Sequence, residues 1–227
     1  MSEGGKIAVI MGGGRGLRMG EETPKQFLPL LGIPLICYCI NAFLRVFAEI
    51  RIRLVLPEDQ LARYTDLLQH LIRHTGIHPV SGGETRFHSV KNGLAGISPG
   101  NIVFVHDGVR PLVSGDLIRR CYRQALDRGN AIPAIPVSES LRMIQDDGNH
   151  ALDRSRFRII QTPQTFRSED LLAAFSQPYS PDFTDEASVL EKSGGVIHLI
   201  AGEERNIKIT RPHDLKLAAL MLADPEK

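Results

Sequence analysis

Two patterns of apolar and polar residues alternate along most of this chain of 227 residues. Short apolar runs rich in β-branched residues are typical of buried strands, and apolar positions spaced three and four apart are typical of amphipathic helices. The runs predict strands at residues 7–11, 50–56, 77–81, 102–106 and 131–137. The patterns between them predict helices at residues 34–46, 58–74, 85–95 and 114–128.

This alternation predicts an α/β fold of three layers, in which a mostly parallel, Rossmann-like sheet carries helices on both faces. Ligands bind such sheets at the carboxyl ends of the strands. A glycine-rich loop follows the first strand, Gly82 and Gly83 follow the third, and Asp107 follows the fourth. We therefore expect these three segments to form one site at one edge of the sheet.

The alternation breaks between residues 138 and 158, where the sequence DDGN at residues 146–149 is a strong turn signal. We predict a protruding β-arm there, either a plain surface ribbon or a dimerisation arm. The chain then returns from the arm to the body through residues 159–161. After these residues, the patterns predict helices at 168–175 and 185–193, strands at 196–200 and 206–209, and a last helix from residue 212. We treat residues 1–227 as a single domain, with residues 138–158 as its dimerisation arm.

The composition narrows the class of protein. Hydrophobic residues make up 42% of the chain, which is enough for one substantial core, and the net charge of +1 argues against binding nucleic acid by charge alone. No apolar run is long enough to span a membrane, and no stretch resembles a secretion signal. The three cysteines, Cys37, Cys39 and Cys121, are odd in number, so we expect reduced structural thiols and a cytoplasmic protein.

The loop after the first strand reads GGGRGLRMG at residues 12–20, and PKQ follows at residues 24–26. Glycines let a polyphosphate approach the main chain closely, because they lack the Cβ that would block it. The dinucleotide fingerprint fails, since its third glycine would fall on Met19, and the P-loop pattern lacks its Gly-Lys pair. An ordinary turn seldom needs so many glycines. The loop therefore predicts a nucleotide-triphosphate site in which Arg18 and Lys25 hold negative charge.

Six segments in order cover nearly the whole chain: the glycine loop with PKQ, GGETRFHSV at 82–90, VHDGVRP at 105–111, TPQ at 162–164, TDEAS at 184–188 and NIKITRP at 206–212. In these segments the chain resembles the 2-C-methyl-D-erythritol 4-phosphate cytidylyltransferases of the non-mevalonate isoprenoid pathway. The resemblance implies a fold of the nucleotidyltransferase type and transfer of a cytidylyl group from CTP to 2-C-methyl-D-erythritol 4-phosphate, with release of pyrophosphate. It also implies Mg²⁺ or another divalent cation, and a homodimer whose arms reach the partner's site.

The resemblance implies roles for residues of this sequence. The catalytic cations would be Arg18, Lys25 and Lys208. The CTP-binding residues would be Gly12, Gly13, Gly14, Gly16, Gly82, Gly83, Ser89 and Asp107, and Asp107 would also bind the metal. The acceptor substrate would be bound by Arg110, Ser140, Arg154 and Thr184. Two departures keep a small residue at the first position: Gly108-Val109 stands where the family often has Ala-Ala, and Gly12-Gly13-Gly14 stands where it often has Ala-Ala-Gly. Ser140 stands where threonine is usual, which keeps the hydroxyl but loses a methyl group.

Several of these residues also have an ordinary structural explanation. Arg18 and Arg110 could be solvated surface arginines, and Asp107 could form a turn with Gly108. Thr184 with its acidic neighbour could simply cap a helix. His70 and His74, four apart, would suit zinc only with the expected glutamate and a third ligand, so a solvated helix face is favoured there.

Two other functions stay open at this point. A ribitol-5-phosphate cytidylyltransferase shares the glycine loop and the sequence PKQFLPL at residues 24–30, although NIKITRP favours the methylerythritol enzymes. A catalytically silent nucleotide-binding regulator is disfavoured because the three cations and Asp107 are all present. A dinucleotide oxidoreductase is disfavoured by Met19.

Overall fold

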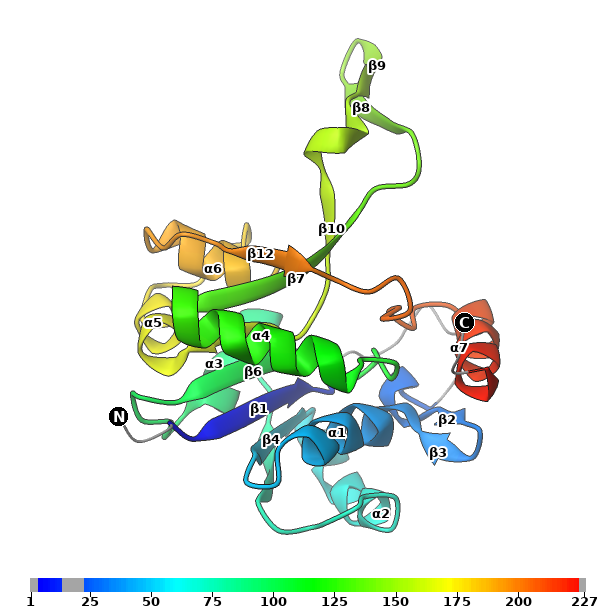
Figure 1. Ribbon diagram of the computed structural model, residues 1–227, viewed down its shortest axis with the longest axis vertical. Helices are drawn as coiled ribbons and strands as arrows, with labels where there is room; N and C mark the ends of the chain where they lie inside the picture. Colours follow the sequence, from blue (N-terminus) through cyan, green and yellow to red (C-terminus); the bar gives the residue numbers. More distant parts are fainter. Residues whose placement is uncertain (1–3, 14–22, 225–227) are drawn as a thin grey trace.

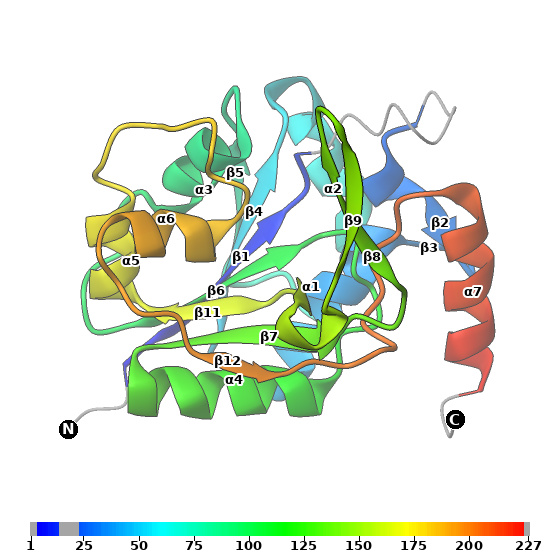
Figure 2. The same cartoon turned by 90° about the horizontal axis from the view of Figure 1, so that it is seen from above.

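The computed structural model describes residues 4–13 and 23–224. Within these ranges an eight-stranded sheet forms the centre, with the order β10-β7-β11-β6-β1-β4-β5 and with β12 paired to β7 (Figure 2). The strands are β1 (Lys6–Met11), β4 (Arg51–Leu56), β5 (Ile77–Ser81), β6 (Ile102–Asp107), β7 (Asn130–Pro136), β10 (Arg158–Ile160), β11 (Gln164–Arg167) and β12 (Leu199–Ala201).

The sheet is mostly parallel, as the sequence predicts. Strand β1 is parallel to both β4 and β6, β4 is parallel to β5, and β12 is parallel to β7. Strand β11 lies antiparallel between β6 and β7, and β10 is antiparallel to β7. Strand β11 was not predicted, because its four residues are too few to show a period of their own.

Alternate residues of the central strands pack against helices on opposite faces of the sheet. Ala8 and Ile10 of β1 belong to a buried cluster with α1 and α4, whereas Ile7 and Val9 belong to one with α3, α5 and α6. Figure 2 shows α3, α5 and α6 grouped together, well apart from α4. The helices are α1 (Leu35–Val46), α3 (Arg86–Leu94), α4 (Gly115–Arg128), α5 (Ser168–Ala174) and α6 (Glu186–Lys192). The predicted three layers are therefore confirmed.

The helix predicted at 58–74 is wrong in its second half. The chain forms a 3₁₀ helix η3 (Glu58–Arg63) and a short helix α2 (Tyr64–Leu68), then continues as turns. The side chain of Asn41 on α1 explains the early end, because its Nδ2 donates to His70 O at 2.8 Å and its Oδ1 accepts from Ile72 N at 3.0 Å. These tertiary bonds satisfy backbone groups that a longer helix would have paired internally.

The strand predicted at 206–209 is also wrong. The segment runs beside the loop after β6 and makes one backbone bond there, from Ile209 N to Val109 O at 2.9 Å, so no ladder forms. The strand predicted at 196–200 lies slightly later, as β12. Two short strands, β2 (Pro29–Leu30) and β3 (Ile33–Pro34), were not predicted, and the last helix, α7 (Pro212–Ala223), begins where expected.

The predicted arm protrudes from the body (Figure 1). Its antiparallel strands β8 (Leu141–Gln145) and β9 (Gly148–Leu152) pair with each other in a separate small sheet, and the 3₁₀ helix η4 (Arg154–Arg156) follows them. Ile144 near its tip is 77% exposed, and Phe157 at its base is 39% exposed. The arm thus presents apolar side chains to its surroundings.

The three cysteines are buried and free. Burial raises the pKa of the Cys37 and Cys121 thiols to about 12, so both stay protonated at neutral pH. This agrees with the expected structural thiols. Among the described residues, no helix has the length and apolar character needed to cross a membrane.

Candidate active site

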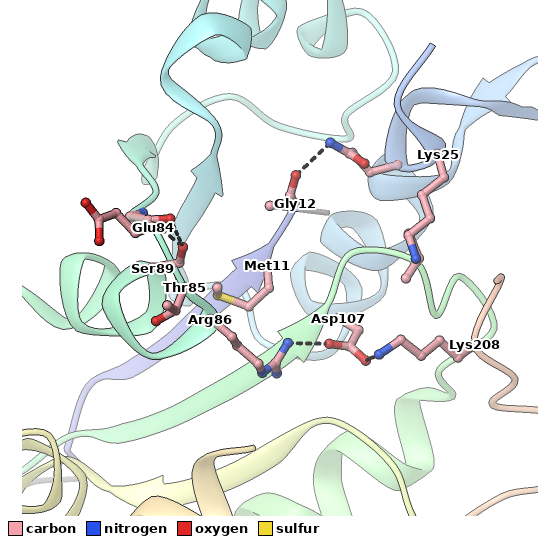
Figure 3. A pocket seen from close by; sticks show the side chains of 13 residues that line it. Met11, Gly12, Lys25, Glu84, Thr85, Arg86, Ser89, Asp107 and Lys208 are labelled. Carbon is pink, nitrogen blue, oxygen red and sulfur yellow. Dashed lines mark hydrogen bonds and ion pairs between the residues drawn. The ribbon is translucent and has the colours of Figure 1, made fainter. Parts of the chain in front are cut away.

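A cavity of about 240 Å³ opens at the carboxyl edge of the sheet. Its lining comes from the end of β1, the 3₁₀ helix at residues 25–27, the loop after β5, the start of α3, the end of β6 with the loop after it, and the segment before α7 (Figure 3). The three segments that the sequence places at this edge therefore do meet. Gly14, Gly16 and Arg18 lie outside the described residues.

Gly12 and Gly13 form the part of the lining that continues β1. Gly12 N donates to Val55 O at 2.8 Å, and an added Cβ there would lie only 2.7 Å from Leu56 Cδ2 and 2.9 Å from Ile36 Cδ1. At Gly13 a Cβ would lie within 4 Å of a single atom of the described residues, Ser89 Oγ at 4.0 Å. Gly12 is thus required by packing, whereas Gly13 leaves space open for a ligand.

Gly82, Gly83 and Ser89 form a tight loop on the other side of the cavity. Ser89 Oγ accepts from Gly83 N at 2.9 Å and donates to Gly83 O at 3.2 Å. Gly83 and Ser89 line the cavity, and Gly82 lines a groove that adjoins it. The hydroxyl of Ser89 therefore shapes this loop.

Lys25 and Lys208 extend into the cavity from two different segments (Figure 3). Lys25 begins the 3₁₀ helix η2 (Lys25–Phe27), which is anchored by the buried side chain of Gln26. Gln26 Nε2 donates to Gly12 O at 2.7 Å and to Gln60 Oε1 at 3.0 Å. This anchor connects the predicted catalytic lysine directly to the glycine loop.

Asp107 is the electrostatic centre of the cavity. Its Oδ1 accepts from Arg86 Nη1 at 2.9 Å, while Oδ2 lies 3.0 Å from Lys208 Nζ and 3.4 Å from Arg110 Nε. Burial by itself would raise the pKa of Asp107, but Arg86, Lys208 and Arg110 outweigh burial and hold that pKa well below its usual range. The carboxylate is therefore ionised at neutral pH.

Arg86 also binds Glu186, in a pairing that the sequence does not predict. Arg86 Nε and Nη2 donate to the two carboxylate oxygens of Glu186 at 3.0 and 3.1 Å. Burial raises the pKa of Glu186 and Arg86 opposes this shift. Both residues lie inside the segments that carry the family resemblance, but they are 100 positions apart, and no local pattern reveals their contact.

Arg110 is buried, so the surface interpretation is wrong for this arginine. It is 8% exposed, and its Nη1 donates to Asn206 O at 2.8 Å. It joins the end of β6 to the segment that carries Lys208, and it lies behind the residues that line the cavity.

His106 completes this buried network. Thr162 Oγ1 accepts from Asp107 N at 3.0 Å, so its proton is available to His106 Nδ1 at 3.1 Å. The other ring nitrogen, Nε2, then carries the hydrogen and donates to Arg110 O at 3.2 Å. Burial lowers the pKa of His106 to about 4, which agrees with a neutral ring.

The remaining acceptor-binding candidates lie away from the cavity. Ser140 and Arg154 are exposed on the arm, where Arg154 Nη1 donates to Ser138 O. Thr184 is exposed before α6, and the helix cap is Asp185, whose Oδ1 accepts from Ser188 N at 2.9 Å. None of these three candidates is among the described residues that line the cavity.

Comparison with known proteins identifies the family. The sequence model of the 2-C-methyl-D-erythritol 4-phosphate cytidylyltransferases, IspD, matches residues 6–224. The chain belongs to this family. The relative from Porphyromonas gingivalis is 48% identical over 218 residues, covering 96% of this chain and 97% of that protein. The relative from Bacteroides thetaiotaomicron is 45% identical over 216 residues, covering 94% of this chain and 98% of that protein.

Solved structures support the same assignment. The crystal structure of 4-diphosphocytidyl-2C-methyl-D-erythritol synthase from Anaerococcus prevotii has a TM-score of 0.82 at 26% identity, and the match covers 98% of this chain and 100% of that one. As a member of the IspD family, the chain is an enzyme, a CTP-dependent cytidylyltransferase. The expected transfer of a cytidylyl group to 2-C-methyl-D-erythritol 4-phosphate is the activity of this family.

Proposed function

We propose that the cavity beside Asp107 binds the triphosphate of CTP and that cytidylyl transfer to 2-C-methyl-D-erythritol 4-phosphate takes place there. One observation carries this proposal: Lys25 and Lys208 line a cavity that is closed on one side by the main chain of Gly12 and Gly13. Exposed main chain together with cations is the combination that binds phosphate groups.

The chemistry is an exchange at the α-phosphorus of CTP. A phosphate oxygen of the acceptor forms the new bond there, the bond to the bridging oxygen breaks, and pyrophosphate leaves with the electron pair. The protein forms no covalent bond, so catalysis consists of positioning and of stabilising charge. Lys25 and Lys208 stabilise the α-phosphate and the departing pyrophosphate, and Arg18 is proposed as a third cation.

A divalent cation such as Mg²⁺ fits this site in one respect. Mg²⁺ is commonly held by one or two carboxylates together with substrate phosphates and water. Asp107 is ionised, and its Oδ1 accepts a bond from Arg86 while keeping a further lone pair. Asp107 would hold the ion with the triphosphate oxygens, and the bound ion would neutralise part of their charge. The described residues contain no group of three or more His, Cys, Asp or Glu side chains that would hold an ion unaided.

The acceptor side is proposed to form between two subunits. Ser140 and Arg154 are exposed on the protruding arm, so they could reach the acceptor of a partner subunit in a homodimer. Thr184 would contact the acceptor near the entrance. Because Arg110 is 8% exposed and lies behind the residues that line the cavity, a direct contact of Arg110 with the acceptor would require those residues to move.

An acceptor assay tests the proposal. Purified enzyme receives CTP and Mg²⁺ with either 2-C-methyl-D-erythritol 4-phosphate or ribitol 5-phosphate, and pyrophosphate release is measured. We expect turnover with the methylerythritol substrate. Turnover with ribitol phosphate alone would establish the alternative acceptor, and CTP binding without turnover of either would indicate a silent regulator.

A matched variant checks the mechanism. We expect Lys25→Ala to lower turnover about 100- to 1000-fold, as the loss of one preorganised charge-stabilising donor typically does. CTP affinity, measured by calorimetry, should change by a much smaller factor. Unchanged turnover in Lys25→Ala would refute the role proposed for this lysine.

A further inference from the structure

We propose that Glu186 is a positioning residue of this active site: it orients Arg86, and Arg86 in turn fixes Asp107 beside the bound nucleotide. The inference rests on the proposed function in one respect, that Asp107 belongs to the CTP site. It assigns a role to two side chains, Arg86 and Glu186, that the proposed reaction does not otherwise use.

The geometry of Arg86 supports this role. Its Nε and Nη2 bind the two oxygens of Glu186, and its Nη1 binds Asp107 Oδ1 at 2.9 Å. The guanidinium is planar, so a bidentate bond to Glu186 sets the direction in which Nη1 points. Although Arg86 lines the cavity, two carboxylates already compensate its charge. Arg86 therefore acts as a spacer between two carboxylates.

Glu186 is held firmly in place by its neighbours. The buried side chain of Gln164 on β11 binds α6 on both sides of Glu186, since its Nε2 donates to Asp185 Oδ2 at 2.9 Å and its Oε1 accepts from Ala187 N at 2.8 Å. Asp185 and Ser188 form a capping box at the same point. The first turn of α6 is thus attached to the central sheet, which makes Glu186 a fixed reference for Arg86.

A stack of aromatic rings joins the same two elements. Phe183, just before α6, stacks on Phe87 of α3 with ring centres 5.5 Å apart, and Phe175 stacks on Phe87 at 4.9 Å. Phe87 follows Arg86 directly. The ion pair and the ring stack together hold the segment that carries Thr184 against the start of α3. Through this double contact, Glu186 also sets the spacing between the proposed acceptor side and Asp107.

The buried ion pair between Arg86 and Glu186 is not explained by a gain in stability. Glu186 is 1% exposed, and burying an ion pair commonly costs as much as the attraction returns. Geometry gives the pair a function that an apolar pair of the same volume would not have.

The test uses two substitutions and their combination. Glu186→Gln keeps the shape but turns an amide donor toward Arg86, and Arg86→Lys keeps the charge but loses the planar fork. We expect each to lower kcat about 10- to 100-fold, as loss of a supporting partner of a ligand-binding group typically does, with a smaller change in KM for CTP. Glu191→Gln, on the exposed side of α6, removes the same charge and should stay within about twofold of wild type.

The double variant decides whether the residues act in series. If Glu186 works through Arg86, the double variant loses about as much kcat as the more damaging single variant. Losses that multiply would overturn the proposal, as would wild-type kcat in Glu186→Gln with only a lower melting temperature. If Glu186→Gln does not fold, kcat and KM of Arg86→Lys decide, and wild-type values there would overturn the proposal.

A second measurement is independent of turnover. The side-chain carboxyl ¹³C resonance of Asp107, assigned by its loss in Asp107→Asn, should shift in both single variants and stay in place in Glu191→Gln. An unmoved resonance in Glu186→Gln and Arg86→Lys would overturn the positioning role. If the wild type fails to use the methylerythritol acceptor while the resonance shifts as expected, the proposed function is wrong and the positioning role stands.

Discussion

At the scale of single residues, similar side chains in this site have different surroundings. Gly12 and Gly13 are adjacent, but only Gly12 is enclosed by side chains, whereas Gly13 borders the open cavity. Lys208 and Arg110 both face Asp107, but the side chain of Lys208 is 42% exposed and that of Arg110 is 10% exposed. Substitutions at the enclosed positions should therefore affect mainly stability, and substitutions at the open positions should affect mainly activity.

The glycine pair gives a first prediction. Gly12→Ala should lower the free energy of unfolding by about 1 to 3 kcal/mol, because its methyl group would overpack against Leu56 and Ile36. Gly13→Ala should leave that free energy within about 0.5 kcal/mol and weaken CTP binding, because its methyl group occupies ligand space. Urea unfolding and calorimetry measure the two effects. Unchanged CTP affinity in Gly13→Ala would show that the triphosphate lies elsewhere.

The two cations on Asp107 Oδ2 give a second prediction. Lys208→Met should lower kcat about 100- to 1000-fold. It should lower the free energy of unfolding by less than Arg110→Met does, because the Lys208 side chain is 42% exposed and water can reach the Asp107 carboxylate in its place. Arg110→Met should instead destabilise the fold by about 3 kcal/mol, because an apolar side chain then faces the buried carboxylate of Asp107 and Asn206 O keeps only its 3.4 Å bond from Gln161 Nε2. Equal losses of stability in both variants would contradict this distinction.

At the scale of elements, connections between strands are held by buried polar groups. Strand β6 ends in His106 and Asp107, and both bind Thr162 in the segment that leads into β11. The same segment accepts a bond at Thr162 O from Asn206 Nδ2 at 2.8 Å. Three stretches of chain are therefore fixed to one another directly behind the cavity.

The His106 ring makes this junction sensitive to pH. Its pKa is about 4 in the folded protein, below its ordinary value, so only the unfolded chain takes up this proton between about pH 6.5 and pH 4. Stability is consequently lost as pH falls through this window, by up to about 1.4 kcal/mol per pH unit. His106→Asn should show a shallower loss in urea unfolding at pH 7 to 4.5. Glu186 titrates in both proteins, so the difference between the two slopes isolates His106, and equal slopes would refute the neutral buried ring.

At the scale of the whole molecule, the arm stands apart from the cavity that it is proposed to serve. Ser140 and Arg154 belong to the protruding arm, while Lys25 and Lys208 belong to the body of the molecule (Figure 1). In a symmetric dimer each complete site would combine the body of one subunit with the arm of the other.

Complementation between two variants that we expect to have lost most activity tests this arrangement. Lys25→Ala and Arg154→Ala are co-expressed with different tags, and the heterodimer is purified. If the arms act in trans, one site receives both defects and the other receives none, so the heterodimer should regain about half of wild-type activity. A heterodimer of Lys25→Ala and Lys208→Ala is the control, and it should stay inactive because each of its sites has one defect. Absence of recovery in the first pair would refute arms acting in trans.

The sequence by itself determined the layered sheet, the edge at which ligands bind, and the family. These follow from local information: the period of apolar residues, the positions of glycines after strands, and short segments in a fixed order. Topology placed the glycine loop, Gly82, Gly83 and Asp107 at one edge, because the carboxyl ends of parallel strands lie together. The family resemblance added Lys208 to this site. The end of the helix near residue 68 escaped prediction, since Asn41 on another helix decides it.

Only the tertiary structure decided which charges pair. Arg86 stands 100 positions from Glu186, and Arg110 stands 96 positions from Asn206, so no spacing along the chain points to either contact. Burial decides the rest, because it keeps His106 neutral and makes Arg110 part of the support behind Asp107. The protonation state and the partners of a side chain depend on its neighbours in space, and the order of strands in the sheet determines which residues those neighbours are.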